Sequence, residues 1–369
     1  MENNICKLIA LLPKGWEEKC LEQKIIERKR EIKTPGDLML LCLFHLVNGC
    51  SLMDTSIAAG YLNIGSLTDV AFMKRFMECG DWFKWISSAI ARKGQAKFAK
   101  PEWLKGYTVV AYDASEVKEQ GCTGQQFRLH YGLDIFSMCT VSHKITKLEV
   151  GETMLNFDVG KGFIAMGDRA YGTVNGIMHC LASGADFIFR LRMDAFQIFS
   201  DKEERVDFLE KFKKLRHGES AEFHGHIKTP KGGRQKVRVC AMRKSEEDCR
   251  KARERVRGTA KRKGQNLREG TEKFNEYIVL VTSLPPKVAK DEVLATYRLR
   301  WQVENYFKRL KSVLGFGELP KKREKASLAW LNGKMMVALL IETLVAGSFF
   351  SLKWKEESEA EYLARDQDS

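Results

Sequence analysis

The sequence predicts a mixed α/β protein in which an α-helical N-terminal domain, residues 1–100, precedes a sheet with helices packed on it. Helix-capping patterns recur before residue 100. After it come short β-prone runs, which later alternate with helical stretches. A third observation is the basic segment 201–275, which holds 23 Lys and Arg residues against 13 Asp and Glu residues and differs from its surroundings.

Two capping patterns separated by a turn stand out in the helical region. Ser51-Leu-Met-Asp54 and Ser66-Leu-Thr-Asp69 have the S-x-x-D spacing, in which a hydroxyl and a carboxylate satisfy the free amides at a helix start. Asn63-Ile-Gly65 lies between them and favours a tight turn. The order helix, short turn, helix is compatible with a helix-turn-helix that reads DNA ends, and equally with a plain helical bundle.

The sheet is predicted from β-prone runs in two stretches of the chain. In the first part of the core, 101–195, strands are expected at 108–112, 126–135, 144–151, 163–166 and 186–190, and a helix at 174–183. A basic, β-rich insertion over 196–276 follows. The second part, 277–350, begins with a strand at 277–281. Pro285-Pro286 then precedes a long helix over 290–314, and 351–369 form a C-terminal tail.

Charge, hydropathy and cysteine usage narrow the class of protein. Sixty-two Lys and Arg against 48 Asp and Glu leave a formal net charge of +14, which favours a polyanionic partner such as nucleic acid. The most apolar window, 335–350, is interrupted by Glu342 and is shorter than the ~20 apolar residues of a membrane span, so a buried helix is expected. The ten cysteines form no C-x-x-C pair, which indicates reduced thiols in a cytoplasmic protein.

Two aspartates come at the ends of β-prone runs. Asp113 follows TVVAY, and Asp168 follows FIAMG. Because ligands bind beyond the strand ends of α/β sheets, both carboxylates are candidate site residues. Taken singly, each aspartate is more often a turn or cap residue.

The predicted helix over 290–314 carries four polar residues with the spacing Y-x2-R-x3-E-x6-K, which are Tyr297, Arg300, Glu304 and Lys311. At 100° per residue they fall within an arc of about 60°. A neighbouring arc is apolar and would pack on the sheet; it contains Val303, Phe307, Leu310 and Leu314. A salt-bridged surface face is the alternative, since the arginine and the glutamate are an i,i+4 pair.

Two aspartates and a glutamate supply the hard oxygen ligands that Mg²⁺ or Mn²⁺ prefers. Two such ions about 3.5–4 Å apart can activate an attacking oxygen and neutralise a leaving oxygen at phosphorus. In this hypothesis Asp113, Asp168 and Glu304 are metal ligands. The arginine and lysine of the helix would hold phosphates, and its tyrosine would donate a hydrogen bond to one.

These residues resemble the signature of the bacterial DDE transposases of the insertion-sequence-four type, a group that includes the transposon-five enzyme. The resemblance runs from about residue 108 to residue 314 and rests on AYDAS around Asp113, MGDRAYG around Asp168 and the Y-R-E-K spacing. Ala170 departs from the pattern, because many members have glycine there, and the change affects a turn rather than a ligand. The resemblance implies an RNase H-like catalytic core whose largely β insertion separates the second aspartate from the glutamate.

The resemblance also implies an activity. A DNA transposase would bind the terminal inverted repeats of an insertion sequence, cleave phosphodiester bonds with two Mg²⁺ (or Mn²⁺) ions per active site, and join the freed 3′-hydroxyl to target DNA. The best-known members pass through a hairpin; the residues do not decide whether this chain does. The catalytic metal ligands would be Asp113, Asp168 and Glu304, and the phosphate contacts would be Tyr297, Arg300 and Lys311.

The expected partners follow from the same resemblance. They are double-stranded DNA, at the transposon ends and at the target, and a second copy of the chain in a DNA-bound homodimer. No membrane is expected, and the location would be the bacterial cytoplasm, at the nucleoid.

Three other hypotheses share some of these features. A transposase-derived protein that binds DNA without cleaving it would keep the fold and the charge, although the intact carboxylate trio argues against it. Another RNase H-like nuclease, such as a junction resolvase, would share the fold and the metals, and only the Y-R-E-K spacing argues against it. A basic nucleoid protein would need no metal at all.

A few remaining polar and aromatic residues have plainer interpretations. His130 and His143 lack the spacing of metal ligands and are expected to be structural. Trp301 is expected in the core or at an interface, with stacking on an exposed base as the alternative. The basic stretch 243–263 is expected to contact the DNA backbone, with a solvated helix that makes no such contact as the alternative.

Overall fold

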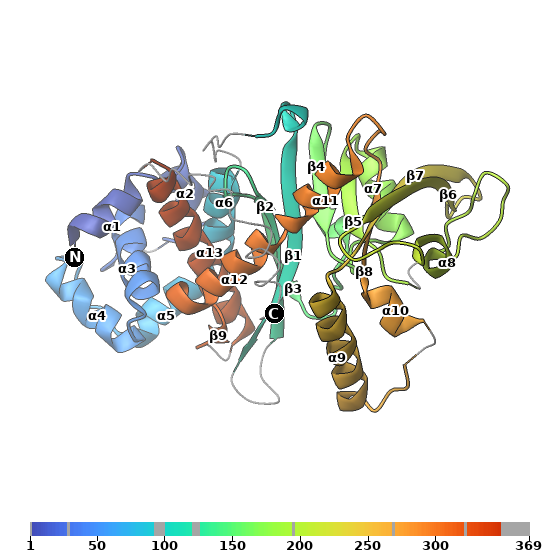
Figure 1. Ribbon diagram of the computed structural model, residues 1–369. Coiled ribbons are helices and arrows are strands. Elements are labelled where there is room, and N and C mark those ends of the chain that lie inside the picture. The colour runs from blue at the N-terminus through green and yellow to red at the C-terminus, as the bar shows by residue number, and fades with distance from the viewer. Residues whose placement is uncertain are drawn as a thin grey trace. The chain divides into compact units, whose positions relative to one another are not determined.

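The computed structural model describes residues 2–27, 30–91, 100–119, 126–193, 196–267, 270–320 and 323–347 (Figure 1). These residues form two compact units, each built from separate stretches of the chain. The first unit takes its described residues from Met1–Phe98, Ala114–Gly151 and Glu304–Leu352, and the second from Ala99–Asp113 and Glu152–Val303. The predicted C-terminal tail, 351–369, lies outside the described residues.

Helices make up the N-terminal part of the first unit. They are α1 (Glu2–Ile9), α2 (Trp16–Glu22), α3 (Pro35–Asn48), α4 (Leu52–Tyr61), α5 (Asp69–Glu78) and α6 (Gly80–Ala91). The long helix α13 (Glu324–Gly347) packs against α3, α5 and α6 (Figure 1). Residues 335–340 of α13 are buried, which confirms a core helix at the start of the most apolar window. Within the described ranges, no helix is long and apolar enough to cross a membrane.

The two predicted caps have different outcomes. Ser51 caps α4 with a complete capping box, as predicted. For α5 the prediction is wrong, since Thr68 rather than Ser66 accepts the free amide at the helix start. The backbone N–H of Ser66 donates instead to the carboxylate of Glu31 at 3.1 Å. The turn 63–65 forms as predicted, with positive φ at its first and last residues.

The first unit also holds strands. β1 (Thr108–Glu119) passes from the second unit into the first, where it neighbours β2 (Gln126–Asp134) and pairs in parallel with the short β9 (Glu318–Leu319). β2 pairs antiparallel with β3 (Cys139–Lys147). The strand predicted at 144–151 is therefore displaced, because the hairpin register sets the start of β3 opposite the end of β2.

The second unit contains a mixed sheet in the order β1-β4-β5-β8-β7-β6. Its further strands are β4 (Phe163–Gly167), β5 (Asp186–Arg190), β6 (Ser220–Lys228), β7 (Arg234–Arg243) and β8 (Tyr277–Thr282). β1, β4 and β5 run parallel, and the other neighbours pair antiparallel. The prediction of a mixed α/β fold is confirmed.

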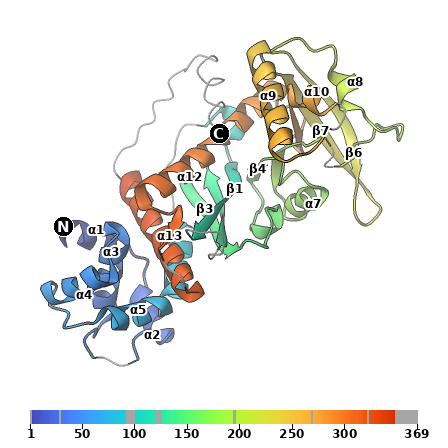
Figure 2. The same cartoon turned by 90° about the horizontal axis from the view of Figure 1, so that it is seen from below.

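Several helices accompany these strands. They are α7 (Val174–Ala182), α8 (Phe208–Phe212), α9 (Glu246–Arg262), α10 (Thr271–Asn275) and α11 (Lys290–Arg298), with 3₁₀ turns η1 (Glu102–Leu104) and η2 (Met154–Asn156). The helix predicted in the basic stretch is α9, which lies beside α10 (Figure 2). The segment 196–276 thus contains β6, β7 and three helices; its role as a separate domain stays a prediction.

The three parallel strands form the core of the second unit. Residues 109–112, 164–166 and 187–189 are completely buried. Because both faces of a parallel strand are covered, such strands are continuous apolar runs rather than alternating ones. This explains why TVVAY and FIAM stand out in the sequence, and it places the residues that follow them at one edge of the sheet.

Candidate active site

The two predicted aspartates directly follow the last residue pair between two parallel strands. β1 and β4 pair in parallel as far as Tyr112 and Gly167. Asp113 and Asp168 are the next residues along, and neighbouring strands are ~4.8 Å apart. The strand end predicted after residue 112 is wrong, because β1 continues to Glu119 after its pairing with β4 stops. The two aspartates still lie next to each other, because the pairing of β1 with β4 up to Tyr112 and Gly167 sets their positions.

The loop after β4 fixes Asp168 through its own backbone. The N–H of Ala170 donates to Oδ1 of Asp168 at 2.8 Å, which closes an Asx-type turn. The φ angle of Ala170 is not positive, so glycine is not required there. Gly172 is required, because a Cβ at this position would lie 2.6 Å from the carbonyl oxygen of Arg190. The loop is therefore packed tightly against the end of β5.

Arg300 forms an ion pair with the first of these aspartates. Its Nη1 lies 3.5 Å from Oδ2 of Asp113, with the two side chains 15% and 17% exposed. The guanidinium also lies over the ring of Tyr297, 6.0 Å from its centroid. A mostly buried carboxylate is thus neutralised by a group that also suits phosphate.

The predicted continuous helix over 290–314 is wrong, because the chain breaks it in two. α12 (Trp301–Leu314) starts after a junction that contains Arg300. There the N–H of Arg300 donates to Tyr297 O at 3.0 Å, and the N–H of Val303 donates to Arg300 O at 3.1 Å. Hydrogen bonds three residues apart wind the chain more tightly than an α-helix. The single 60° arc predicted for the four polar residues therefore does not apply across the junction.

α12 buries most of its predicted apolar stripe. The buried members are Val303, Phe307 and Leu310, whereas Leu314 is half-buried. Glu304 lies in the first turn of the helix and is half-buried, and Lys311 is exposed in its last turn. Both residues belong to the first unit.

Four of the six predicted site residues lie in the second unit, namely Asp113, Asp168, Tyr297 and Arg300. Of the carboxylate trio, the structure thus brings the two aspartates together within one unit and does not place Glu304 with them. In the described part of the chain, no three Asp, Glu, His or Cys side chains are close enough together to hold a metal ion.

Buried hydroxyls lie beside the aspartates. The hydroxyl of Tyr171 has no hydrogen-bond partner among the described residues, and burial followed by Asp113 and Glu152 raises its pKa. The buried hydroxyl of Tyr297 makes no hydrogen bond of full geometry in the described ranges, and burial raises its pKa against the effect of the nearby Arg300. Unsatisfied buried polar atoms call for a ligand or water. Together with two adjacent carboxylates they fit a divalent cation and a phosphate.

Two arginines that the sequence patterns do not single out also lie near the aspartates. Arg190 is the last residue of β5, and Arg169 follows Asp168 directly. Burial, and then repulsion from Arg190, lowers the pKa of Arg169 to about 10. Nη2 of Arg169 donates to Oδ1 of Asn275 at 2.7 Å. Arg190 ends a β-prone run, as the two aspartates follow theirs. This position is the sequence feature from which Arg190 could have been predicted.

Comparison with known families covers this whole arrangement. A family model described as "Transposase DDE domain" matches residues 105–340, which is well over half of the chain and includes all six predicted site residues. The chain belongs to the DDE transposase family. The InsL protein of insertion sequence element IS186A from Escherichia coli strain K12 is 27% identical to this DDE transposase over 329 residues, 88% of each chain. The transposase for insertion sequence element IS421 from Escherichia coli is 27% identical over 330 residues, again 88% of each chain.

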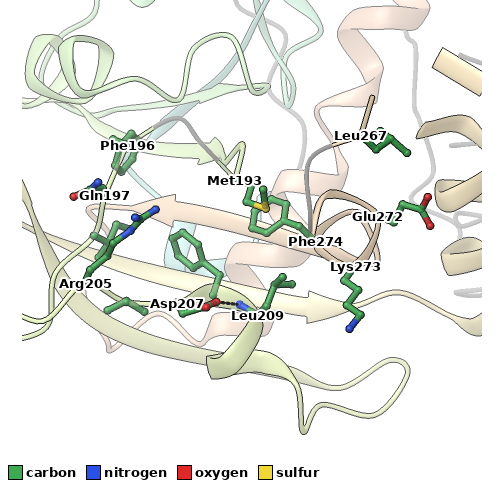
Figure 3. A pocket seen from close by; sticks show the side chains of 14 residues that line it. Met193, Phe196, Gln197, Arg205, Asp207, Leu209, Leu267, Glu272, Lys273 and Phe274 are labelled. Carbon is green, nitrogen blue, oxygen red and sulfur yellow. Dashed lines mark hydrogen bonds between the residues drawn. The ribbon is translucent and has the colours of Figure 1, made fainter. Parts of the chain in front are cut away.

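A cavity of about 900 Å³ lies elsewhere in the second unit of the DDE transposase (Figure 3). Phe196, Arg205 and Phe274 are among the residues that line it, which are 193, 196–198, 205–209, 267, 270 and 272–274. None of the predicted site residues lines it. The candidate active site is therefore the region around Asp113 and Asp168, and not this cavity.

Two of the seven histidines of the DDE transposase, His130 and His143, lie in the β2–β3 hairpin of the first unit. Nε2 of His130 lies 2.9 Å from Oγ1 of Thr146. Burial lowers the pKa of both His130 and His143 to about 4. Both imidazoles are therefore neutral in the folded protein at neutral pH, which fits a structural role.

We expect the free energy of unfolding to fall as the pH is lowered from 7 to 5. Unfolded histidine has a pKa of ~6.5, so the unfolded chain takes up protons that the folded chain excludes. The contribution of the neutral imidazoles is present above pH ~6.5 and is lost between there and pH ~4. Urea denaturation at several pH values measures this slope, and His130→Gln should flatten it. Equal slopes in the two proteins would contradict the assignment.

Proposed function

We propose that this protein is the transposase of an insertion sequence, which cuts DNA at the ends of its element and joins the freed 3′-hydroxyl to target DNA. The observation that supports the proposal most is that Asp113 and Asp168 directly follow the last residue pair of the β1–β4 ladder, with Arg300 ion-paired to Asp113. The family match and the relatives from insertion sequence elements support it as well. In this proposal β1, β4 and β5 belong to an RNase H-like core.

The proposed cofactor is Mg²⁺ or Mn²⁺, with two ions per active site held by Asp113, Asp168 and Glu304. Carboxylate oxygens are the ligands that these hard cations prefer. When bound, such ions supply Lewis-acid stabilisation of the charge that develops at phosphorus and activate the attacking oxygen. The strand ends contribute two rigid ligands, and the first turn of α12 contributes the third.

The remaining site residues act on the DNA strand. The guanidinium of Arg300, which is ion-paired with Asp113, would hold a phosphate through a two-pronged contact. The buried hydroxyl of Tyr297 donates a hydrogen bond to the same strand, and Lys311 adds a mobile positive charge. Arg190, at the end of β5, joins this phosphate-binding set.

Each chemical step exchanges one P–O bond for another. Hydrolysis at the element end forms a bond between phosphorus and the water oxygen and leaves a 3′-hydroxyl. In strand transfer that 3′-oxygen bonds to a target phosphorus and releases a 3′-oxygen of the target strand. Attack on the opposite strand instead gives a hairpin, which a denaturing gel separates from a linear end.

The arginines of α9 are mostly occupied within the protein. Arg253 pairs with Glu276 at 2.7 Å, and Arg257 pairs with Glu272 at 2.7 Å, which ties α9 to α10 and the start of β8. At the C-terminal end of α9, residues 261–263 are basic and exposed, with no ion pair in the described part of the chain. We propose that these three charges contact the DNA backbone.

Replacing Lys261, Arg262 and Lys263 together with alanine should weaken DNA binding and flatten its dependence on salt. Each lost phosphate contact lowers the slope of log K against log[salt] by about 0.9. Fluorescence anisotropy across a salt series measures this slope. Arg257→Ala is the matched control on the same helix, since it removes a charge already paired with Glu272. A triple variant with the slope of the control would contradict the proposed contact.

Incubation with a supercoiled plasmid that carries the terminal repeats, with Mg²⁺ or Mn²⁺, tests the function. The proposal predicts cuts at the ends of the element, followed by joined products. Binding without cleavage under either metal would favour an inactive, transposase-derived DNA-binding protein. Cleavage of branched DNA that lacks the repeats would favour a junction nuclease.

We also propose how the protein recognises DNA ends, how many copies assemble on them and where in the cell this happens. The helix pair α4–α5 is proposed to read the DNA ends, and two copies of the chain to bridge two ends in the nucleoid of a bacterial cell. Light scattering with and without end DNA measures the assembly. A complex with one copy for two ends would contradict the dimer.

A further inference from the structure

Hydrogen-bond donors from two strands of the first unit converge on the carboxylate of Glu342 in α13. The backbone N–H of Thr140 in β3 donates to Oε2 at 3.2 Å, and its hydroxyl lies 2.9 Å from Oε1. The hydroxyl of Tyr131 in β2 donates to Oε1 at 3.3 Å and also contacts the Thr140 hydroxyl. Since an ionised carboxylate only accepts hydrogen bonds, this set of donors suits it.

Tyr306 brings α12 into the same cluster. Its ring stacks on Tyr131 with centroids 4.5 Å apart and planes 16° apart. Phe307, the next residue, meets Tyr131 edge-on at 5.7 Å. The buried hydroxyl of Tyr306 has no hydrogen bond of full geometry among the described residues, yet it lies close enough to Glu342 to lower the pKa of that carboxyl. α12, α13 and the β2–β3 hairpin thus meet at one carboxylate.

Packing alone does not require an acid at this position. Burial raises the pKa of Glu342 despite the donors around it. An ionised carboxylate with a raised pKa lowers stability at neutral pH relative to its protonated form. Replacing buried charges with apolar side chains is often neutral or stabilising. A carboxylate placed at such a cost is therefore a candidate for a functional role.

We infer that Glu342 is a positioning residue, which holds α12 against the β2–β3 hairpin through Tyr306 and Tyr131 and thereby aims Glu304. Residues two apart lie about 200° apart around a helix. A contact that fixes Tyr306 on the hairpin side therefore turns Glu304 to the opposite side. The inference rests on the proposed function in one respect, namely that Glu304 is a catalytic metal ligand.

The same contact reaches the N-terminal helices. α13 packs on α3, α5 and α6, so the carboxylate joins the helix that carries Glu304 to the bundle that contains the proposed end-reading pair. The hydrogen bonds of the Glu342 carboxylate described above run to the β2–β3 hairpin rather than to those helices, so a change at Glu342 is expected to alter the chemistry of bound DNA more than the binding of DNA.

Three variants test the inference. Glu342→Leu removes the acceptor at similar size, and Glu342→Gln keeps one acceptor oxygen and the shape of the side chain. Glu324→Gln is the matched control, because Glu324 is also in α13 but pairs with Lys147 at 3.0 Å on a partly exposed surface. The measurements are hydrogen–deuterium exchange of residues 301–314, affinity for end DNA, and cleavage rate at saturating DNA.

In Glu342→Leu, exchange over 301–314 should rise while exchange in α3 and α6 stays unchanged. Cleavage should fall by about 100-fold, the effect of a displacement of ~1 Å in a catalytic group, with unchanged affinity for DNA. Glu342→Gln should recover part of the rate, and Glu324→Gln should match the parent protein. The recovery and the split between rate and affinity separate positioning from a general loss of stability.

Unchanged exchange over 301–314 in folded Glu342→Leu overturns the inference, whether or not the protein cleaves DNA. If the parent protein does not cleave but the variant loosens only this segment, the positioning role stands and the proposed function fails. If Glu342→Leu does not fold, Glu342→Gln is measured in its place. Exchange and rate equal to the parent in Glu342→Gln then overturn the inference.

Discussion

Asp113→Asn and Asp168→Asn are each expected to lower DNA cleavage by about 10⁴-fold or more, since removing one member of a catalytic unit has effects of this size. Asparagine has the size of aspartate but lacks the charge that holds a divalent cation. Affinity for end DNA should stay equal or increase, because a negative charge beside the phosphates is lost. In Asp113→Asn, Arg300 is also released from its ion pair.

Cleavage of end-bearing plasmid, measured beside gel-shift binding, separates the two effects. Asp186→Asn is the matched control, because Asp186 begins β5 at the opposite edge of the same sheet, where its Oδ1 accepts the hydroxyl of Ser283 at 2.7 Å. Glu304→Gln should behave like the first two variants, and chelation of divalent ions should stop cleavage in every protein. If Asp113→Asn cut as fast as the control, the assignment of the metal site would be lost.

Arg300→Ala is expected to reduce cleavage by about 10²- to 10³-fold, the usual effect of removing one donor that stabilises developing charge. The guanidinium is well placed for this role, since it is mostly buried beside Asp113 and over the ring of Tyr297. The salt dependence of binding should also fall by about one phosphate contact, 0.9 in slope. The cleavage rate of Arg300→Lys should lie between those of the parent protein and Arg300→Ala, because an ammonium ion keeps the charge but cannot make the two-pronged contact.

Single-turnover cleavage and a salt series of binding measurements test this expectation. Arg298→Ala provides the control two residues away, where the guanidinium contacts the sulfur of Met242 at 3.1 Å. Equal losses in Arg298→Ala and Arg300→Ala would point to a general effect of charge. Such a result would contradict a specific contact between Arg300 and a phosphate.

Local patterns account for the parts of the fold that the sequence predicts well. Apolar runs at 109–112 and 164–166 identify buried parallel strands, because such strands need apolar residues on both faces. The stripe that contains Val303 and Phe307 identifies the buried side of α12 for a similar reason. Each of these patterns is complete within a few residues of chain.

Errors arise where a distant residue decides the local structure. Thr68 rather than Ser66 caps α5, and the backbone N–H of Ser66 donates to Glu31, which lies far back in the sequence. The junction at Arg300 depends on hydrogen bonds that the spacing of the helix residues does not reveal. A regular helix is the simplest expectation when no proline or glycine interrupts the pattern.

In the candidate site, too, the sequence predicts the features that nearby residues determine and misses those that distant residues determine. Strand ends point to Asp113 and Asp168, but only the pairing of β1 with β4 makes them neighbours. Tyr171 escapes prediction because its proximity to the aspartates comes from burial in a loop, which no spacing rule describes. The placement of Glu304 relative to the aspartates stays a prediction.

The contact between Gly172 and the carbonyl of Arg190 bears on where the chain tolerates changes in length. Added residues between β4 and α7 would push Asp168 out of line with β1, and a longer β5 would meet the same obstacle. Exposed connections such as the turn 229–233 between β6 and β7 carry no such constraint. Insertions and deletions accumulated during divergence are therefore expected there, while the spacing from Asp168 to Arg190 is kept.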